Sequence, residues 1–520
     1  MRLFHITLGY LLKCFKPYWI IALFSGALLP FGFAPFHLPG LALLGLTFFF
    51  AQLSYGLTTS GKSGRTQAFM TGFAFGLGYL GFGVSWVFVS IHDYGHLNFV
   101  LSGLITLLFV AYLSLFTGVV AYLYQRLAVH RAKLTRCLMF SALWCFGEYA
   151  RATLLTGFPW MLLGFGQIDT PLKFLLPVIG VYGVGFLACF AASCLAILSQ
   201  EKKSNQLSWL MAFMGLLIAP MALKDTPWTD QQNNAVSVGV IQANLSMRDK
   251  WDEALFWKVL GYYKKETEKL MGKTQLIVMP ESAIPAPDSY VSDFLDAMHQ
   301  QSQASNTAIL LGIPEEPSQN TYYNSLLALG TASGSYQKKH LVPFGEFIPK
   351  PFQRIINWLS IPLTNITAGR HDQPLIEVNH HPIATLICYE LAYPNLLREQ
   401  LPAAEWIVSI SDDGWFGHSF AMYQQLQMAQ VLSVQTGRYQ IVANNDGLSS
   451  VINTQGVIIK SLPAYQSGIL KSTIYPSTGA SPWVIWGDKP VLLFSFMIVV
   501  SGLLQKLRSY RLSRLVQDLP

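Results

Sequence analysis

Charge is scarce in this sequence. Only 12% of its 520 residues are Asp, Glu, Lys or Arg, whereas 52% are hydrophobic and the mean hydropathy is +0.36. An ordinary soluble protein carries about 25% charged residues. In a chain of this length, that deficit excludes a purely soluble globular protein, a disordered chain and a disulfide scaffold.

Acidic residues in particular are almost missing from the first part of the chain. Before Asp225 there are only Asp93, Glu148, Asp169 and Glu201, although the whole sequence has 28 Asp and Glu residues. The sequence therefore joins a charge-poor first part to a normally charged second part. It ends in a further apolar run and a basic tail.

Long apolar runs fill the charge-poor part. A helix needs about 20 mostly apolar residues to cross the hydrocarbon core, because backbone polar groups cannot stay unpaired in lipid. Eight runs approach this length, at residues 18–36, 41–57, 67–91, 99–127, 134–155, 172–198, 207–223 and 490–507. The sequence therefore predicts a polytopic α-helical membrane domain with eight transmembrane helices.

The Lys and Arg residues predict how these helices are oriented. They gather in the first 16 residues, in the loops near residues 62–65, 126–136 and 202–203, and in the C-terminal tail, whereas the loops near residues 37 and 93 contain none. Both termini are therefore predicted to lie in the cytoplasm, with the segment after the seventh helix outside it. The net charge of +7 is a topology signal and not the footprint of a nucleic-acid partner.

Two charged residues, Glu148 and Arg151, lie close to one helical turn apart on the fifth predicted span. An ionisable residue at membrane depth is a functional candidate by default. The alternative is a structural ion pair near the membrane interface.

From Asn234 onward, short β-branched strands alternate with polar helical stretches. Strands are predicted at residues 236–242, 275–279, 308–312, 382–388, 406–411 and 440–443, with helices at 252–271 and 292–302. This alternation predicts one α/β domain, in which chemistry gathers where strands end. The predicted domains are residues 1–224 with seven helices, 225–487 as the exported domain, and 488–520 with the eighth helix and the tail.

Cys388 is the only one of the six cysteines that falls in the exported domain. It therefore cannot form a disulfide within that domain, although an exported compartment oxidises paired thiols. A lone cysteine is often a buried, inert side chain. Its place at a turn from a strand to a helix is instead typical of an outward-facing nucleophile.

Two other residues are candidate partners of this thiol. Glu281 follows the apolar strand that begins near Leu276, and Lys338 lies in a segment where Tyr336, Lys338 and His340 are predicted to share one face of a strand. A lone Glu at such a position is often a helix cap, and a lysine pair is usually a solvated surface feature.

Taken together, the residues resemble a known family. Met279-Pro-Glu281, Tyr336-Gln-Lys338-Lys-His340 and Ile387-Cys388-Tyr389-Glu390 resemble the Glu-Lys-Cys triad of the nitrilase superfamily. The segments Leu341–Pro349, Asp413–Gly417, Ser85–Ser90 and Gly157–Trp160 are similar to the apolipoprotein N-acyltransferases of Gram-negative bacteria. The resemblance covers nearly the whole chain. It implies eight membrane spans and a nitrilase-like αββα sandwich that faces the periplasm from the inner membrane.

The resemblance also implies an acyl transfer in two halves. The sn-1 acyl chain of a phospholipid, typically phosphatidylethanolamine, passes to Cys388 as a thioester and then to the α-amino group of a diacylglyceryl apolipoprotein. Glu281 is expected to be the general base, which requires surroundings that raise its proton affinity, and Lys338 is expected to stabilise the oxyanion. Neither a cofactor nor a metal is expected, nor is a nucleic-acid partner, and the protein is expected to be a monomer.

Further residues match the family pattern in supporting positions. Glu346 is expected to support the lysine and the intermediate, while Tyr389 and Glu390 shape the pocket around the nucleophile. The expected lipid contacts are Trp251, on a segment that matches the family's mobile arm, and the cleft-lining residues Phe344, Trp415 and Phe416.

The sequence departs from the family pattern at four positions. Asp412 stands where the family usually has Asn, and Gln425, Gln430 and Val442 stand where it often has His or Arg. These differences are expected to affect local surface contacts and substrate docking, and they leave the triad unchanged.

Two other functions compete with acyl transfer. A membrane-tethered nitrilase-type amidase would use the same triad to hydrolyse soluble amides without phospholipid. A transporter or receptor with an exported binding domain would keep working after alkylation of Cys388.

Overall fold

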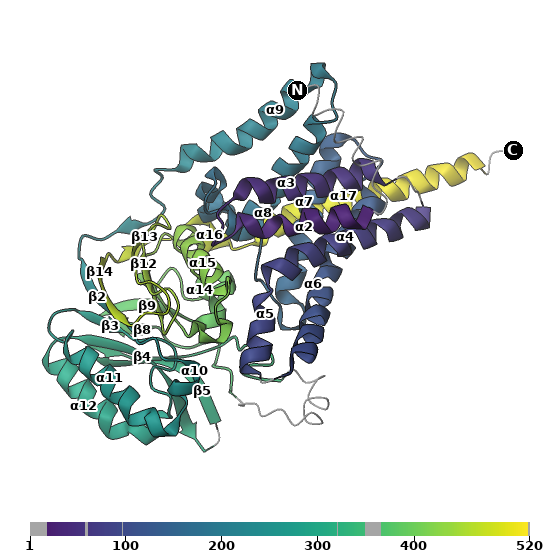
Figure 1. Cartoon of the computed structure of the whole chain (residues 1–520). Helices are drawn as coiled ribbons and strands as arrows, with labels where there is room; N and C mark the ends of the chain where they lie inside the picture. Colours follow the sequence, from purple (N-terminus) through teal and green to yellow (C-terminus); the bar gives the residue numbers. More distant parts are fainter. Residues whose placement is uncertain (1–17, 58–60, 96, 320, 349–365, 518–520) are drawn as a thin grey trace. The chain divides into compact units, whose positions relative to one another are not determined.

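The computed structural model describes residues 18–57, 61–95, 97–319, 321–348 and 366–517. The chain divides into two compact units (Figure 1). One comprises Met1–Thr226 with Trp486–Pro520, and the other comprises Pro227–Ile485.

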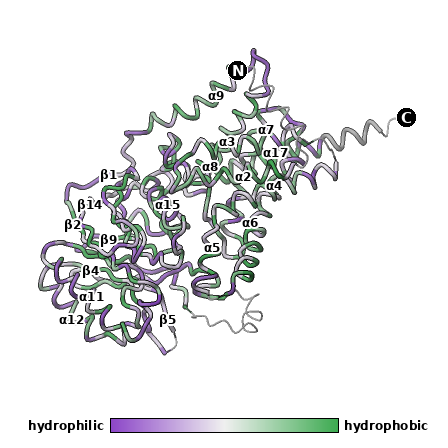
Figure 2. The backbone as a smooth tube through the Cα atoms, viewed as in Figure 1, coloured by the Kyte–Doolittle hydropathy of each residue, from purple (hydrophilic) through white to green (hydrophobic). Residues whose placement is uncertain are grey.

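The first unit is helical. Its main helices are α2 (Tyr18–Ala27), α3 (Pro39–Ala51), α4 (Gly61–Gly83), α5 (Trp86–Val89), α6 (Phe99–Leu127), α7 (Lys133–Thr153), α8 (Leu176–Leu198), α9 (Lys203–Ile218) and α17 (Lys489–Gln517). Hydrophobic residues run along most of their length (Figure 2). Several are apolar around most of their circumference, as expected of helices that meet lipid on one side and protein on the other.

Five helices of the described residues are long and apolar enough to cross a membrane, and the bent pair of α4 and the segment to Tyr94 would make a sixth. Two of the predicted spans fall short for visible reasons. The first apolar helix is short and reaches only Gly32, with Pro30 in its last turn. The fifth, α7, carries charged residues at both ends. The total of eight spans therefore stays a prediction.

The second unit contains two main β-sheets. The six-stranded sheet has the order β14 (Gly468–Ile474), β2 (Val236–Gln242), β3 (Leu276–Val278), β4 (Ala308–Ser318), β5 (Thr321–Gly330) and β7 (Ser335–Gln337). The seven-stranded sheet has the order β13 (Ile458–Ser461), β12 (Ser450–Ile452), β11 (Gln440–Asn444), β10 (Trp406–Ser411), β9 (His381–Ile387), β8 (Ile376–Val378) and β6 (Ala332–Ser333). A short pair joins β1 (Asp230–Gln231) to β15 (Ser477–Thr478).

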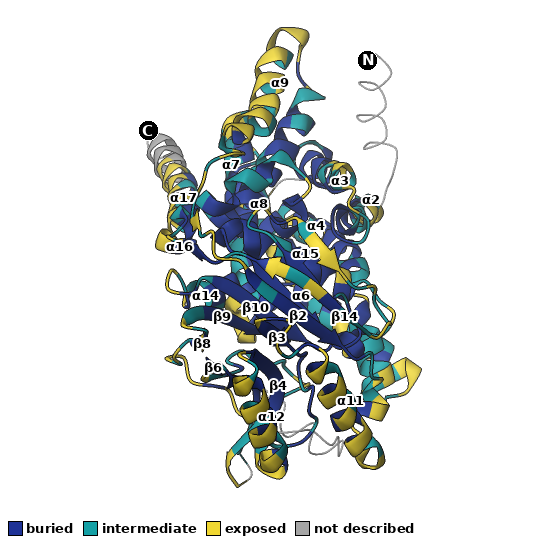
Figure 3. Cartoon of the chain, turned by 90° about the vertical axis from the view of Figure 1, so that its left-hand side faces the viewer, coloured by how far each residue is buried: buried dark blue, intermediate teal, exposed yellow. Residues whose placement is uncertain are grey.

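Alternation of side chains along the strands produces four layers. Leu276 and Val278 of β3 join Ile387 of β9 in the core between the sheets. Ile277 packs instead against α11 (Phe256–Glu268) and α12 (Ser292–Ala304). On the other sheet, Leu386 packs against α14 (Pro394–Arg398) and α15 (Ala421–Thr436). The central strands are accordingly buried, whereas the edge strands β13 and β14 are partly exposed and α11 and α12 keep exposed outer faces (Figure 3).

The sheet order places the ends of several strands at a common edge. Strands β2, β3 and β4 are parallel to one another, as are β9, β10 and β11. The residues that follow these strands include Asn244 after β2, Glu281 after β3, Cys388 after β9, Asp412 after β10 and Asn445 after β11. In open parallel sheets, ligands bind outside these carboxyl ends.

The predicted elements agree with these strands apart from their ends. Strands 236–242 and 406–411 have the predicted bounds, whereas β4 continues to Ser318. The helix predicted from residue 252 begins at Phe256. Ser246 and Asp252 cap the short helical turns α10 (Met247–Lys250) and η8 (Glu253–Leu255) that precede it.

Candidate active site

Cys388 lies at a sharp turn between β9 and a 3₁₀ turn, η11 (Cys388–Ala392). Its φ of +54° is a left-handed backbone conformation that is uncommon for residues other than glycine. Burial raises the pKa of this thiol well above its usual value, with a smaller contribution from Glu281 in the same direction and an opposing one from Lys338. The thiol therefore stays protonated near neutral pH and needs a base to become a nucleophile.

Lys338 lies one residue beyond β7, which ends at Gln337, so the strand is shorter than the predicted one. Its Nζ is 3.3 Å from Glu281 Oε1 and 2.9 Å from Glu346 Oε1. Desolvation, the strongest influence, would lower the pKa of Lys338, but the two carboxylates together raise it well above its usual value. Lys338 is therefore a buried, permanent cation.

Glu281 is held by donors from three directions. Its Oε1 accepts hydrogen bonds from Lys338 Nζ and, at 2.7 Å, from Asn324 Nδ2, and its Oε2 accepts one from the main-chain N–H of Asp412 at 3.0 Å. Asn324 also donates to Glu346 Oε1 at 3.0 Å, so the amide bridges the two carboxylates. Asn324 was not predicted from the sequence. It stands next to Ser325 in the polar first half of β5, so no local pattern distinguished this amide, which is 7% exposed.

Glu390 joins the segment that carries Lys338 to the turn that carries Cys388. Its Oε1 accepts main-chain hydrogen bonds from Lys339 at 2.7 Å and His340 at 3.0 Å, and its Oε2 accepts one from Ile387 at 2.8 Å. The Tyr336 hydroxyl donates to the same carboxylate at 3.1 Å. Burial raises the pKa of Glu390 to about 7, against the effect of these donors.

The remaining predicted residues differ in exposure. Tyr389 is buried and its hydroxyl accepts a hydrogen bond from the Tyr393 hydroxyl at 3.1 Å. Trp251, Phe344 and Trp415 each expose about half of their surface. Phe416, which was expected to line the same cleft, is buried.

Three of the four departures from the family pattern do not lie at the surface expected for them, whereas Gln430 is half-buried. Asp412, Gln425 and Val442 are buried, and Asp412 forms an ion pair with the buried Lys250. Gln425 accepts a hydrogen bond from the Ser411 hydroxyl at 3.3 Å, and Gln430 donates to the Gly456 carbonyl at 2.8 Å. The polar side chains at these positions therefore form contacts within the domain.

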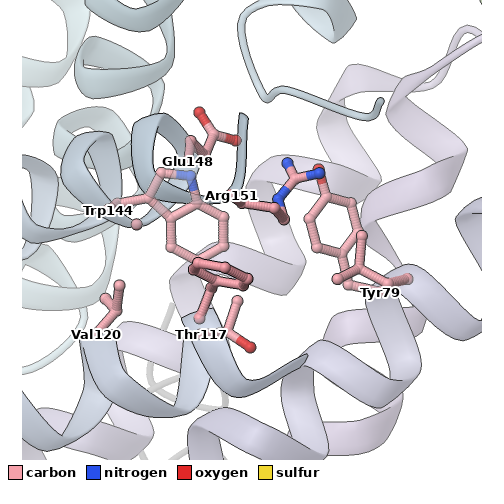
Figure 4. Close-up of a pocket in the computed structure, with 9 residues that line it drawn as sticks. Tyr79, Thr117, Val120, Trp144, Glu148 and Arg151 are labelled. Carbon is pink, nitrogen blue, oxygen red and sulfur yellow. The ribbon is translucent and has the colours of Figure 1, made fainter. Parts of the chain in front are cut away.

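In the helical unit, Glu148 and Arg151 line a small pocket with Tyr79, Thr117 and Trp144 (Figure 4). Both are buried, and both bind the main chain of the segment after α7. Glu148 Oε1 accepts from the Leu163 N–H at 2.8 Å, and Arg151 Nη1 donates to the Trp160 carbonyl at 2.6 Å. Glu148 and Arg151 therefore have a structural role, but they hold the main chain after α7 and do not form the expected ion pair with each other.

Among the described residues, no three His, Cys, Asp or Glu side chains gather where they could hold a metal ion. A protonated thiol, a carboxylate and a buried cation are the groups that covalent acyl chemistry uses.

Comparison with known proteins identifies the families that the two parts of the chain match. Residues 237–481 match the model of the carbon-nitrogen hydrolase family, and residues 25–194 match that of the apolipoprotein N-acyltransferase N-terminal domain. The sandwich unit is thus a carbon-nitrogen hydrolase domain joined to a helical region with several apolar helices.

Relatives that match along the chain define the family more closely. The proteins named apolipoprotein N-acyltransferase from Coxiella burnetii and Methylococcus capsulatus are 37% and 34% identical to it, each over 91% of this chain and over 97% and 93% of their own lengths. That of Azotobacter vinelandii is 33% identical over 94% of this chain and 96% of its own length. The chain belongs to the apolipoprotein N-acyltransferase family, and the resemblance predicted from its motifs is confirmed.

Proposed function

We propose that this protein transfers the sn-1 acyl chain of a phospholipid, through a thioester on Cys388, to the α-amino group of the N-terminal diacylglyceryl-cysteine of apolipoproteins. Membership of the family supports the reaction. The observation that carries the residue assignment is the buried contact of Lys338 with Glu281, whose charges both act on the Cys388 thiol.

In the first half of the reaction, Glu281 removes the proton of the Cys388 thiol as the sulfur attacks the ester carbonyl. The oxygen that becomes negative is stabilised by Lys338, which is already charged and already desolvated. The carbon–oxygen bond then breaks, and the lysophospholipid leaves with the proton that Glu281 had taken. The acyl group remains on sulfur.

In the second half, the α-amino group of the acceptor attacks the thioester carbonyl. Glu281 takes the amine proton, the carbon–sulfur bond breaks, and the proton returns to the sulfur of Cys388. An amide is more stable than a thioester, so the reaction runs toward the triacylated product. Glu346 and Asn324 hold Lys338 and Glu281 in place through both halves.

The membrane accounts for the two-unit chain. Both substrates are anchored by acyl chains, so we place the enzyme in the bacterial inner membrane with residues 225–487 facing the periplasm and eight spans in all. The concentration of Lys and Arg in every second loop supports this orientation, since the opposite set of loops has only Arg151 and Lys173. Phosphatidylethanolamine is the proposed donor, and Trp251, Phe344 and Trp415 are the proposed lipid contacts. The working unit is a monomer.

An amidase would have the same triad and a similar sandwich. The helical match over residues 25–194 and the relatives matched along the whole chain favour acyl transfer over this alternative. A transporter has no use for a buried lysine held between two glutamates beside a thiol.

The test is a product assay on the purified full-length protein. It is given phosphatidylethanolamine with a labelled sn-1 chain and a diacylated lipopeptide with a free N-terminal amine. We expect label in the lipopeptide as an amide, one lysophospholipid for each amide, and no product with an N-acetylated lipopeptide. Release of labelled free fatty acid at the same rate with and without the lipopeptide would contradict acyl transfer and favour a hydrolase.

A further inference from the structure

The structure contains a second buried lysine beside the candidate active site. Lys250 ends α10, three residues after Met247, and its side chain is fully buried. Its Nζ donates to the main-chain carbonyl of Glu281 at 2.8 Å and forms an ion pair with Asp412. A lysine in a polar stretch usually extends into water, so its burial against the proposed base calls for a role.

Asp412 holds the other side of the same glutamate. Its main-chain N–H donates to Glu281 Oε2 at 3.0 Å, while its carboxylate binds Lys250. Asp412 Oδ1 also accepts a hydrogen bond from Asn445 Nδ2 at 3.1 Å. Lys250 therefore binds the main-chain carbonyl of Glu281, and Asp412, which pairs with Lys250, binds the Glu281 carboxylate.

Asn445 connects Asp412 to the segment that precedes α10. Its Nδ2 donates to the Leu245 carbonyl at 2.8 Å, and its Oδ1 accepts from the Leu245 N–H at 3.1 Å. The side chain next to Lys250 is Trp251, which is half exposed. One short segment therefore presents an aromatic ring outward and a buried ammonium group inward to the proposed base.

From these contacts we infer that Lys250 is a positioning residue for Glu281, acting together with Asp412, and that it links the seating of the Trp251 segment to the orientation of the base. This inference rests on the proposed role of Glu281. It assigns a function to Asp412, because a carboxylate at this position supplies the charge that lets Lys250 be buried.

The pair also sets the charge around the base. The charged and titratable groups that face Glu281 are Lys338, Glu346, Cys388, Lys250 and Asp412, and Asp446 interacts electrostatically with Lys250 and Asp412 from the segment after β11. With Lys250 and Asp412 both present, their charges offset each other. Removing either one leaves a single charge beside Glu281, and the two removals act in opposite directions on its ionisation.

The test compares Lys250→Met, Asp412→Asn and the double variant with the wild type. The readout is the rate of Cys388 alkylation by iodoacetamide as a function of pH, measured on the full chain in detergent, together with kcat and KM of acyl transfer. Alkylation needs no lipid substrate, so it reports on the base even if acyl transfer is not the reaction.

For Lys250→Met, the uncompensated Asp412 makes Glu281 harder to ionise, so we expect the acidic limb of the alkylation profile to move to higher pH. We also expect kcat to fall about tenfold to a hundredfold with a KM for phospholipid that changes little, since general-base assistance contributes at least this much. Asp412→Asn leaves the positive charge of Lys250 uncompensated, so it should move the acidic limb of the alkylation profile to lower pH. The double variant should return it to the wild-type position.

The controls separate positioning from a loss of folding. Lys269→Met removes a lysine paired with Glu266 on the surface and should leave the profile unchanged. Arg438→Met removes a buried cation that binds the carbonyls of Ala404 and Gly479, and it should lower thermal stability without moving the limb. A limb that shifts the same way in both single variants, or in neither, would overturn the inference. Failure of the wild type to transfer acyl groups would overturn the proposed function instead.

Discussion

Lys338 is a cation held almost out of contact with water, with 1% of its surface exposed, between the carboxylates of Glu281 and Glu346. In the proposed reaction, its charge needs no solvent rearrangement when the oxyanion forms, which is what makes a fixed charge effective in such a site. In the resting protein, Lys338 also compensates the negative charge of these two buried carboxylates.

Lys338→Met tests this role. We expect the rates of thioester formation and of aminolysis to fall by about 10²–10³, because one oxyanion donor is lost. The fold should also be weakened, because breaking a buried pair leaves uncompensated charge. Each half-reaction is measured separately in single-turnover experiments, and a thermal melt shows how much folded protein remains. Unchanged aminolysis in a folded variant would contradict the assignment.

Cys388 leads to a prediction about pH. Since burial raises the pKa of the thiol above its usual value of 9.0, little thiolate exists at neutral pH without a base. Glu281→Gln removes the proton acceptor while keeping the side chain's size. Alkylation at pH 7 should then fall about a hundredfold and recover only in strongly alkaline solution. A profile like that of the wild type would show that Glu281 does not take the thiol proton.

At the scale of elements, the site depends on how closely neighbouring strands approach one another. Gly312 of β4 lies beside the segment after β3, and a Cβ there would come within 2.3 Å of the Pro280 carbonyl oxygen and 2.7 Å of Glu281 Cα. These are backbone atoms, so the segment after β3, which carries Glu281, would have to shift.

Gly312→Ala is therefore expected to lower acyl transfer by about a hundredfold, as a displacement of about 1 Å at a catalytic group can do. Gly261→Ala is the matched control. It lies on α11 with nothing within 4 Å of the added carbon, and should leave activity unchanged while stabilising the helix by about 0.5–1 kcal/mol. Equal activity in the two variants would mean that Glu281 tolerates displacement.

Glu390 fixes the relation between two elements, and both its oxygens accept hydrogen bonds. Glu390→Gln would place an amide N–H against at least one of the main-chain donors from Lys339, His340 and Ile387. We expect a stability loss of about 1–3 kcal/mol, measured by thermal melting, and a lower kcat. A variant that melts with the wild type and keeps its kcat would show that the carboxylate is not needed to join these segments.

The sequence predicts the strand ends with Glu281 and Cys388 well, because an apolar strand followed by one polar residue is a local pattern. It fails for Lys250 and Asn324. Their importance depends on which strands pair and in which register, and neither is encoded locally. A lysine among polar residues gives no sign that it will be buried. The membrane spans are predicted less completely, because Pro30 ends the first apolar helix just after α2 and because charged residues lie near both ends of α7.

At the scale of the whole molecule, the proposed orientation predicts which residues a membrane-impermeant reagent reaches. Lys471→Cys, at an exposed position of β14, should be labelled by a charged maleimide in cells with a permeabilised outer membrane. Lys202→Cys, before α9, should be labelled only after the inner membrane is broken. The wild type measures the background from the six native cysteines, of which the five in the described residues are buried. The reverse pattern would place the sandwich in the cytoplasm.

The most direct measurement is the mass of the peptide that contains Cys388 after the full-length protein meets phosphatidylethanolamine with no acceptor present. We predict a gain of one acyl chain on that peptide, removed by neutral hydroxylamine and lost when a diacylated lipopeptide is added, and no gain in Cys388→Ala. An unmodified Cys388 in a preparation that still acylates the lipopeptide would contradict the covalent route on which the account depends.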